Sequence, residues 1–308
     1  MKNKKLVPLL LAAAIPGAAA LGVIPVTDNL GLRGFVDALY SDSDVGGTDT
    51  KELKINAVDV DFIFSMEKTG AEVHLSSSGG DVSLEQAFVT YDLGGGLGVA
   101  GGKYLSLLGY EGDEPYKLNQ QSMAFVIGND NKIPFAGYHQ GVKAFYSSGD
   151  LSGAISVVDS VYGSDGTAGD VGFEAQIKYT GLENFIIALG TAQDSQSAAT
   201  GIDNYYNVWV QYNGIDSLVL GAEYNSYDIA KKNGDSWMVM GNYALNDNTG
   251  VTVRFSDVDE GTAYNGDKFT ISPNYSFSDN LLGRLEYSTG ESGTSDVDSL
   301  VLELLFTF

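Results

Sequence analysis

The side chains that most often perform catalysis are scarce in this chain of 308 residues, which has two histidines, His74 and His139, and no cysteine. Neither histidine lies in an HExxH motif or in a cluster with metal-ligand spacing. The glycine-rich segment 94–98 lacks the strand, loop and helix that form a phosphate cradle. The sequence therefore predicts no enzyme, no cofactor and no histidine-based active site.

Carboxylates are the abundant reactive groups, and two short segments concentrate them: EGDE at residues 111–114 and DVDEG at residues 257–261. Carboxylate oxygens bind divalent cations, but neither segment has the spacing of a dedicated calcium loop. We expect weak surface binding of cations and no metal site. What these acids do depends on the elements that position them.

The first residues indicate export. MKNKK supplies three lysines, and LVPLLLAAAIPGAAA is an apolar segment too short to span a bilayer, with Ala18 and Ala20 forming an A-x-A cleavage site. We therefore expect residues 1–20 to be a signal peptide and residues 21–308 to be the mature protein. Removing three of the 17 basic side chains leaves 14 against 40 acidic ones, a net charge of −26. Nucleic acid is an implausible partner for such a chain.

Alternation of apolar and polar residues recurs along the mature chain and predicts β-strands. In one segment, for example, Tyr206 and Val208 alternate with Asn207 and Trp209. No apolar run beyond the leader reaches about 18 residues, which excludes a membrane helix but not a membrane barrel. The sixteen expected strands are 31–40, 55–66, 70–77, 84–93, 97–104, 136–147, 151–159, 170–179, 184–193, 204–213, 217–227, 236–245, 250–258, 267–277, 281–290 and 298–308.

The connections between these strands differ by parity. Tight turns such as KTG, GGG and NDN follow even-numbered strands, whereas longer acidic stretches such as SDSDVGGTDTKE and SVYGSDGTAG follow odd-numbered ones. A membrane barrel has short periplasmic turns and long outer loops, but a soluble sandwich has no reason to sort its loops. The predicted fold class is all-β, a transmembrane antiparallel β-barrel of about 16 strands, with 14 or 18 as neighbouring counts.

The last predicted strand, 298–308, ends the chain on an aromatic residue. Every second residue from Leu300 to Phe308 is apolar, and the alternate face carries Glu303 and hydroxyl groups. We expect the apolar face to contact lipid, with Phe306 and Phe308 in an interfacial aromatic girdle. As an edge, this strand must also pair with the first strand to close the barrel.

Several segments resemble the β-barrel porins of Gram-negative outer membranes. The likeness rests on QAFVTYDL at residues 86–93, GKYLSLLGYE at 102–111, IPFAGYHQGVKAFY at 133–146, and the terminal aromatic. The resemblance implies that the barrel-assembly machinery reads Phe308 and Phe306 as an assembly signal. It also implies a location in the outer membrane, contact with lipid and lipopolysaccharide, and a possible homotrimer.

The long connection 105–135 is the third outside loop, which general porins fold into the barrel to narrow it. If it folds inward, Glu111, Asp113 and Glu114 are candidate constriction carboxylates; the alternative is a solvated surface loop. The acids of the facing wall are Asp37, Asp59, Asp61 and Glu72, and the bases of the opposite wall are Lys143, Lys178, Arg254 and Arg284. Because the first strands are mainly acidic, passage of anions is in doubt.

The predicted function is passive diffusion of small hydrophilic solutes, with a preference for cations. The outer connections add further acids that concentrate cations at the mouth, namely Asp42, Asp44, Asp49, Asp165, Asp259 and Glu260. An alternative from another class is an outer-membrane barrel with a plugged lumen that serves adhesion or envelope architecture. A secreted soluble β-protein is the third possibility.

Overall fold

The computed structural model describes residues 22–127, 130–131, 137–161, 171–194, 202–229, 232–261 and 263–308. The predicted signal peptide and Asp165 lie outside the described residues. The described helical structure is one 3-10 turn, η1 (Pro115–Lys117). No helix in the described part of the chain is long and apolar enough to cross a membrane.

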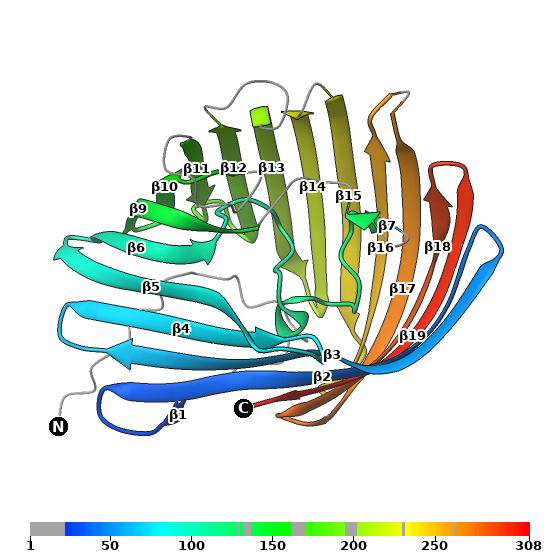
Figure 1. Cartoon of the computed structure of the whole chain (residues 1–308), viewed down its shortest axis with the longest axis horizontal. Helices are drawn as coiled ribbons and strands as arrows, with labels where there is room; N and C mark the ends of the chain where they lie inside the picture. Colours follow the sequence, from blue (N-terminus) through cyan, green and yellow to red (C-terminus); the bar gives the residue numbers. More distant parts are fainter. Residues whose placement is uncertain are drawn as a thin grey trace.

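Sixteen antiparallel strands form one closed barrel, which confirms the predicted fold class (Figure 1). The strands are β2 (Leu30–Val45), β3 (Thr48–Ser65), β4 (Thr69–Ser77), β5 (Ser83–Gly94), β6 (Leu97–Leu105), β9 (Tyr138–Ser148), β10 (Leu151–Val158), β11 (Gly172–Tyr179), β12 (Phe185–Asp194), β13 (Ile202–Ile215), β14 (Leu218–Ile229), β15 (Lys232–Ala244), β16 (Thr249–Asp259), β17 (Asn265–Ser278), β18 (Leu281–Ser292) and β19 (Ser295–Thr307). Short strand β1 (Ile24–Pro25) pairs with β2, and β7 (Val126–Ile127) pairs with β8 (Asp130–Asn131).

The barrel closes where β19 pairs with β2. The backbone of Phe308 makes two hydrogen bonds with Gly34, one in each direction, both 2.9 Å. Gly34 has to lack a side chain, because a Cβ there would lie 2.6 Å from Cζ of Phe308 and 2.3 Å from the carbonyl oxygen of Asp59. The terminal aromatic therefore fits a position on the first strand that only glycine can supply.

The two faces of each strand differ as the alternation predicts. On β19, Leu302 is 56% exposed on the outside, whereas its neighbour Glu303 is 2% exposed on the inside. The same alternation on β13 leaves Tyr206 exposed and buries Tyr205. Since an apolar outer band is what a bilayer requires of a barrel, the outward residues form the lipid face.

The connection after the first strand is not the long loop that the sequence predicts. β2 and β3 continue beyond the predicted ends and meet at Gly46 and Gly47, whose φ angles are +61° and +84°. Positive φ at both central positions is the geometry of a two-residue hairpin turn. Opposite charges also pair across the extension, with Lys51 Nζ 2.7 Å from Asp42 Oδ2. The acids that were predicted to lie in a loop therefore lie on an extended hairpin.

The longest connections follow β6, β10 and β12. Turns after β3, β5, β13 and β17 are short, as predicted for the periplasmic end. The described part of the connection after β6 does not remain outside the barrel but bonds to inward-facing residues of the wall.

Candidate functional site

Residues 106–125, here called the inward loop, follow β6 and run through the inside of the barrel. Figure 1 shows this segment in cyan to green, carrying η1 and ending at β7, between the strands of the early and late halves of the chain. Its side chains and backbone contact inward-facing residues of the wall on two sides. It is therefore held at both flanks of the lumen.

The first part of the inward loop attaches to β11 and β13. Ser106 Oγ donates to the carboxylate of Glu174, and the backbone N–H of Leu107 donates to the same group at 3.3 Å. The hydroxyl of Tyr110 donates to Gln211 Oε1 at 3.0 Å. Burial raises the pKa of Tyr110, so its hydroxyl stays protonated and remains a donor.

The centre of the second attachment is Arg254 on β16. Its Nη1 lies 2.5 Å from Glu111 Oε1 and 2.7 Å from the carbonyl oxygen of Ser122. Glu111 also accepts from the backbone N–H of Ala124 at 2.6 Å. Arg254 is fully buried, so this ion pair is shielded from water. The predicted constriction acid Glu111 is thus compensated by a base and anchors the loop.

Neighbouring strands add backbone contacts to this attachment. Glu286 on β18 accepts from the N–H groups of Gln121 and Ser122 at 2.7 and 3.0 Å. Arg284 donates to the carbonyl oxygens of Pro115 and Leu118 at 3.0 and 2.7 Å. Charged side chains of the late strands therefore satisfy loop backbone groups that would otherwise be buried without partners.

Asp113 and Lys117 form an ion pair within the inward loop, with 2.8 Å between Oδ1 and Nζ. The hydroxyl of Tyr138 donates to the other oxygen of Asp113. Burial alone would lower the pKa of Lys117, but the nearby Asp113, Tyr116 and Glu114 together outweigh this effect and raise the pKa of Lys117 above its ordinary value. The second predicted constriction acid is thus also paired with a base.

Glu114 lies near one base, Lys117, but acids surround the rest of its carboxyl group. It is buried beside Asp59 of β3 and Glu85 of β5. Burial, reinforced by the neighbouring Asp113 carboxylate, raises the pKa of Glu114 to about 9. Asp59 also lies against Asp61 on the same strand. We call these four residues, Asp59, Asp61, Glu85 and Glu114, the acidic cluster.

A network on β2, β3 and β4 adjoins the acidic cluster. Arg33 donates from Nε to Asp61 Oδ2 at 2.6 Å and from Nη2 to Glu72 Oε2 at 3.0 Å. Glu72 also lies 2.9 Å from Nε2 of His74. The fourth predicted wall acid, Asp37, accepts from Nδ2 of Asn56 at 2.7 Å. One ligating atom each of His74, Glu85 and Glu114 lies within 4.8 Å of the others, a spacing that could hold a metal ion.

The four predicted bases of the opposite wall are distributed around the lumen. Lys143 on β9 lies with Nζ 4.2 Å from the ring centroid of Tyr104, and Lys178 on β11 lies 5.0 Å from that of Trp209. Arg254 is on β16, and Arg284 on β18 pairs with Glu303 at 2.9 Å. Because β18 pairs with β19, and β19 pairs with β2, Arg284 flanks the acidic wall rather than facing it.

Glu85 was not predicted from the sequence as an inward residue. In strict alternation it would point outward, because Gln86 points inward, but the pairing between β4 and β5 shifts register here. His74 pairs with Gln86 and Leu75 with Leu84, which leaves Glu85 as the extra residue of a bulge. A bulge redirects a side chain, and it brings the Glu85 carboxylate to the lumen side. A two-residue period contains no signal for such a slip.

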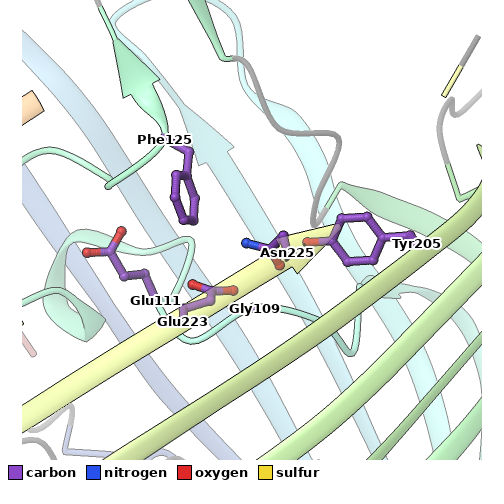
Figure 2. A pocket seen from close by; sticks show the side chains of 6 residues that line it. All are labelled: Gly109, Glu111, Phe125, Tyr205, Glu223 and Asn225. Atoms are coloured by element: carbon purple, nitrogen blue, oxygen red, sulfur yellow. Dashed lines mark hydrogen bonds between the residues drawn. The ribbon is translucent and has the colours of Figure 1, made fainter. Parts of the chain in front are cut away.

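Glu223 on β14 was also missed. Figure 2 shows Glu223 and Glu111 beside a small pocket between the inward loop and the wall. The pocket is lined by Gly109, Glu111, Phe125, Tyr205, Glu223 and Asn225. Asn207 Nδ2 donates to Glu223 Oε1 at 2.7 Å, so an amide holds this carboxylate in place. Its inward position follows the alternation of β14.

Solved structures with the same fold are outer-membrane barrels. A triple mutant of the porin of Rhodopseudomonas blastica aligns with a TM-score of 0.66 and 15% identity, covering 91% of this chain and 100% of that one. OmpT folded in vitro, an outer membrane protein of Vibrio cholerae, aligns with a TM-score of 0.66 and 12% identity over 93% of this chain and 99% of that one. No curated protein sequence matches significantly.

The family described as "Putative beta-barrel porin-2, OmpL-like" matches residues 64–300. The match spans most of the chain, so the chain belongs to this family. It is a porin-like β-barrel of the Gram-negative outer membrane. The resemblance predicted from residues 86–146 and the C-terminus is confirmed.

Proposed function

We propose that this porin-family barrel is a passive diffusion channel for small hydrophilic solutes that prefers cations. Barrels of sixteen strands enclose an aqueous channel. The inward loop narrows that channel from within, because it is bonded to Glu174 on one flank and to Arg254 on the other. A fixed loop in a polar lumen supports a pore of defined width.

The acidic cluster is the observation that carries the cation preference. Asp59 and Glu114 face other carboxylates, whereas Glu111 and Asp113 each pair with a base. Because the raised pKa of Glu114 keeps this group largely protonated at neutral pH, the ionised carboxylates among its neighbours make the β3–β5 side of the lumen negative. At the mouth, the extended hairpin adds Asp42, Asp44 and Asp49, the end of β16 adds Asp259, and the connection after it adds Glu260.

Planar bilayer recordings test this function. A KCl gradient across a bilayer that contains the purified protein should give stepwise openings and a reversal potential of the sign that K⁺ preference requires. A preference for Cl⁻ would contradict the electrostatic argument. Openings in groups of three would support a homotrimer, and independent single steps would support a monomeric pore.

A barrel plugged by the inward loop, with a role in adhesion or envelope architecture, is the second candidate. It is favoured by the bonds that fix the inward loop to the late strands, including those from Arg284 and Glu286. Solute flux into reconstituted liposomes separates the two functions. A channel admits small sugars at a rate set by their size, and a plugged barrel excludes them.

We also propose that the protein is not an enzyme. Both histidines direct ring nitrogens to carboxylates, with His74 Nε2 2.9 Å from Glu72 and His139 Nε2 3.2 Å from Glu174. Ser106 donates to Glu174 and thus does not serve as a nucleophile activated by His139. Hydrolase assays on ester and peptide substrates should give no turnover above the buffer rate.

The barrel-assembly machinery is the proposed partner of the C-terminal strand. Phe306 and Phe308 stack with ring centroids 6.0 Å apart at the end of β19. Deleting Phe308 removes both this aromatic and its two bonds to Gly34, so we expect nearly complete loss of the protein from the outer membrane. Immunoblots of membrane fractions measure this loss, and Leu304→Ile is the control. Normal membrane levels of the truncated chain would contradict the assembly role.

A further inference from the structure

Three strands and the inward loop converge on one group of potential metal ligands. His74 comes from β4, Glu85 from the bulge of β5, and Glu114 from the inward loop, with one ligating atom of each within 4.8 Å of the others. Asp59 of β3 lies against Glu85. These residues are far apart in sequence, so no short sequence motif predicts the group.

The carboxylates here lack donors. Within the described structure, both oxygens of Asp59, Oδ1 of Asp61 and Oε2 of Glu85 are buried with no hydrogen-bond partner. Asp59 is 2% exposed and Asp61 is 3% exposed, so water does not solvate them freely. Buried charge is costly unless it is paired or coordinates a metal. Arg33, the nearby base, is directed to Asp61 Oδ2 and to Glu72.

The orientation of His74 gives a second, independent indication. Gln86 accepts from the N–H of Leu105 at 3.1 Å, so its NH₂ group is the one that faces His74 Nδ1 at 3.0 Å. With the NH₂ group in this orientation, Nδ1 carries a lone pair that accepts from Gln86, and Nε2–H donates to Glu72; a metal ion bound at Nδ1 would replace the Gln86 N–H as its partner. A carboxylate behind one ring nitrogen is the usual support of a metal-binding histidine.

With the proton of His74 on Nε2, two hydrogen-bond acceptors face each other. Oδ1 of Asp61 lies 3.1 Å from Nδ1 of His74, and neither atom supplies a proton to the other. Two ligands about 2.1 Å from a shared metal ion have this separation. A cation between them would convert a repulsive contact into coordination.

We propose that His74, Asp59, Asp61, Glu85 and Glu114 bind one divalent first-row metal ion that connects the inward loop to the β3–β5 wall. A single imidazole among carboxylates suits Mn²⁺ or Zn²⁺ better than Ca²⁺ or Mg²⁺, which take oxygen ligands. Glu114 supplies the ligand from the loop side. The site goes beyond solute diffusion, and its occupancy is measurable whether or not the barrel conducts.

Binding of Mn²⁺ tests the site. The full-length barrel, purified in detergent and stripped with EDTA, is titrated with MnCl₂ while the six-line electron paramagnetic resonance signal of free Mn²⁺ is recorded. One ion per chain should bind. Affinity should fall about tenfold or more in Glu114→Gln and in His74→Gln, the range typical of lost metal-site contacts. The control is Glu52→Gln, which changes an exposed carboxylate on β3 paired with Lys54.

The competing explanation is that the carboxyls share protons. In that case Mn²⁺ shows no saturable binding, and the proposal is overturned. Unchanged affinity in Glu114→Gln and His74→Gln would overturn it equally. Zn²⁺ should displace Mn²⁺ at lower concentration than Ca²⁺ does; the reverse order would overturn the role of the imidazole. Heat-modifiable gel mobility verifies folding of each variant, and Glu114→Gln, on the loop, leaves the wall strands unaltered.

Discussion

The two sides of the lumen use the same residue types in opposite ways. On the late strands, Arg254 pairs with Glu111 and Arg284 pairs with Glu303, so each buried charge has a counter-charge. On the early strands, Asp59 has no hydrogen-bond donor and lies against other acids. The paired side can hold the inward loop in place, because Arg254 and Arg284 each bond both to a carboxylate and to carbonyl oxygens of the loop. The acidic side stores unfavourable electrostatic energy, which is the usual mark of a functional region.

Breaking a buried ion pair on the paired side should change the stability of the barrel more than any other substitution proposed below. Arg254→Met leaves Glu111 buried without its base, and breaking a buried ion pair typically costs about 3–5 kcal/mol. We expect the free energy of unfolding to fall by that amount in urea titrations of the barrel in lipid vesicles. The inward loop should also become sensitive to protease added to the folded protein.

The control for this variant is Lys54→Met, which removes a base from the exposed pair with Glu52. Exposed pairs contribute roughly 0–1 kcal/mol, so the control should be close to wild type. A double variant, Arg254→Met with Glu111→Gln, should recover part of the loss. Equal effects of Arg254→Met and Lys54→Met would refute the difference between buried and exposed pairs.

Neutralising a carboxylate on the acidic side should raise the free energy of unfolding, whereas breaking the paired side lowers it. Asp59→Asn removes a buried carboxylate without a donor and supplies an NH₂ group that can bond to Glu85 or Asp61. In EDTA-treated protein we expect the free energy of unfolding to rise by about 1–3 kcal/mol, the cost of an unsatisfied buried group. The same urea titration measures it. A clear loss of stability would mean that Asp59 already has a favourable partner.

Charge removal at the inward loop should alter ion selectivity. Asp113→Asn combined with Glu114→Gln removes the negative charge of Asp113 and a second carboxyl group, Glu114, whose raised pKa of about 9 keeps it largely protonated at neutral pH. A unit charge at 10 Å in water contributes about 0.4 kcal/mol, so we expect a roughly twofold to fourfold fall in the permeability ratio of K⁺ to Cl⁻. The reversal potential in a KCl gradient measures this ratio. An unchanged value would show that the ions pass elsewhere.

The same formal change at the hairpin should have the smallest effect. Asp44→Asn combined with Asp49→Asn also removes two carboxyl groups, but these residues lie on the extension of β2 and β3 near the turn. The difference from wild type should be below twofold at 0.1 M salt and disappear at 1 M, because the Debye length falls from about 10 Å to about 3 Å. An effect that persists at 1 M would place these acids beside the ion path.

The fold was predictable because a barrel repeats one simple pattern. Each strand has a lipid face and a lumen face, so a two-residue period marks the strand and the orientation of its side chains. The prediction was wrong after the first strand, where acids, glycines and threonines resemble a loop although they extend a hairpin. Local composition does not reveal that cross-strand pairs such as Asp42 with Lys51 are available.

The candidate site was less predictable. Alternation identified Arg254 as inward, and the connection after β6 identified Glu111, but only the folded loop brings the two together across 143 positions. The inward position of Glu85 was not predictable, because a bulge interrupts the two-residue alternation of inward and outward side chains on β5. Tertiary contacts decide which acids have a base beside them and which do not. The sequence alone does not reveal these contacts.

The hairpin turn after β2 offers a point for surface labelling. A side chain at Gly47 would meet nothing within 4 Å, whereas the N–H of Gly46 donates to the carbonyl oxygen of Asp296 on β19 at 2.9 Å. A short epitope inserted between Gly46 and Gly47 would project beyond the rim while leaving the barrel seam at Gly34 intact. Antibody staining of whole cells would then report directly which rim faces the exterior, and the opposite rim could be tagged at the turn after β5 for comparison.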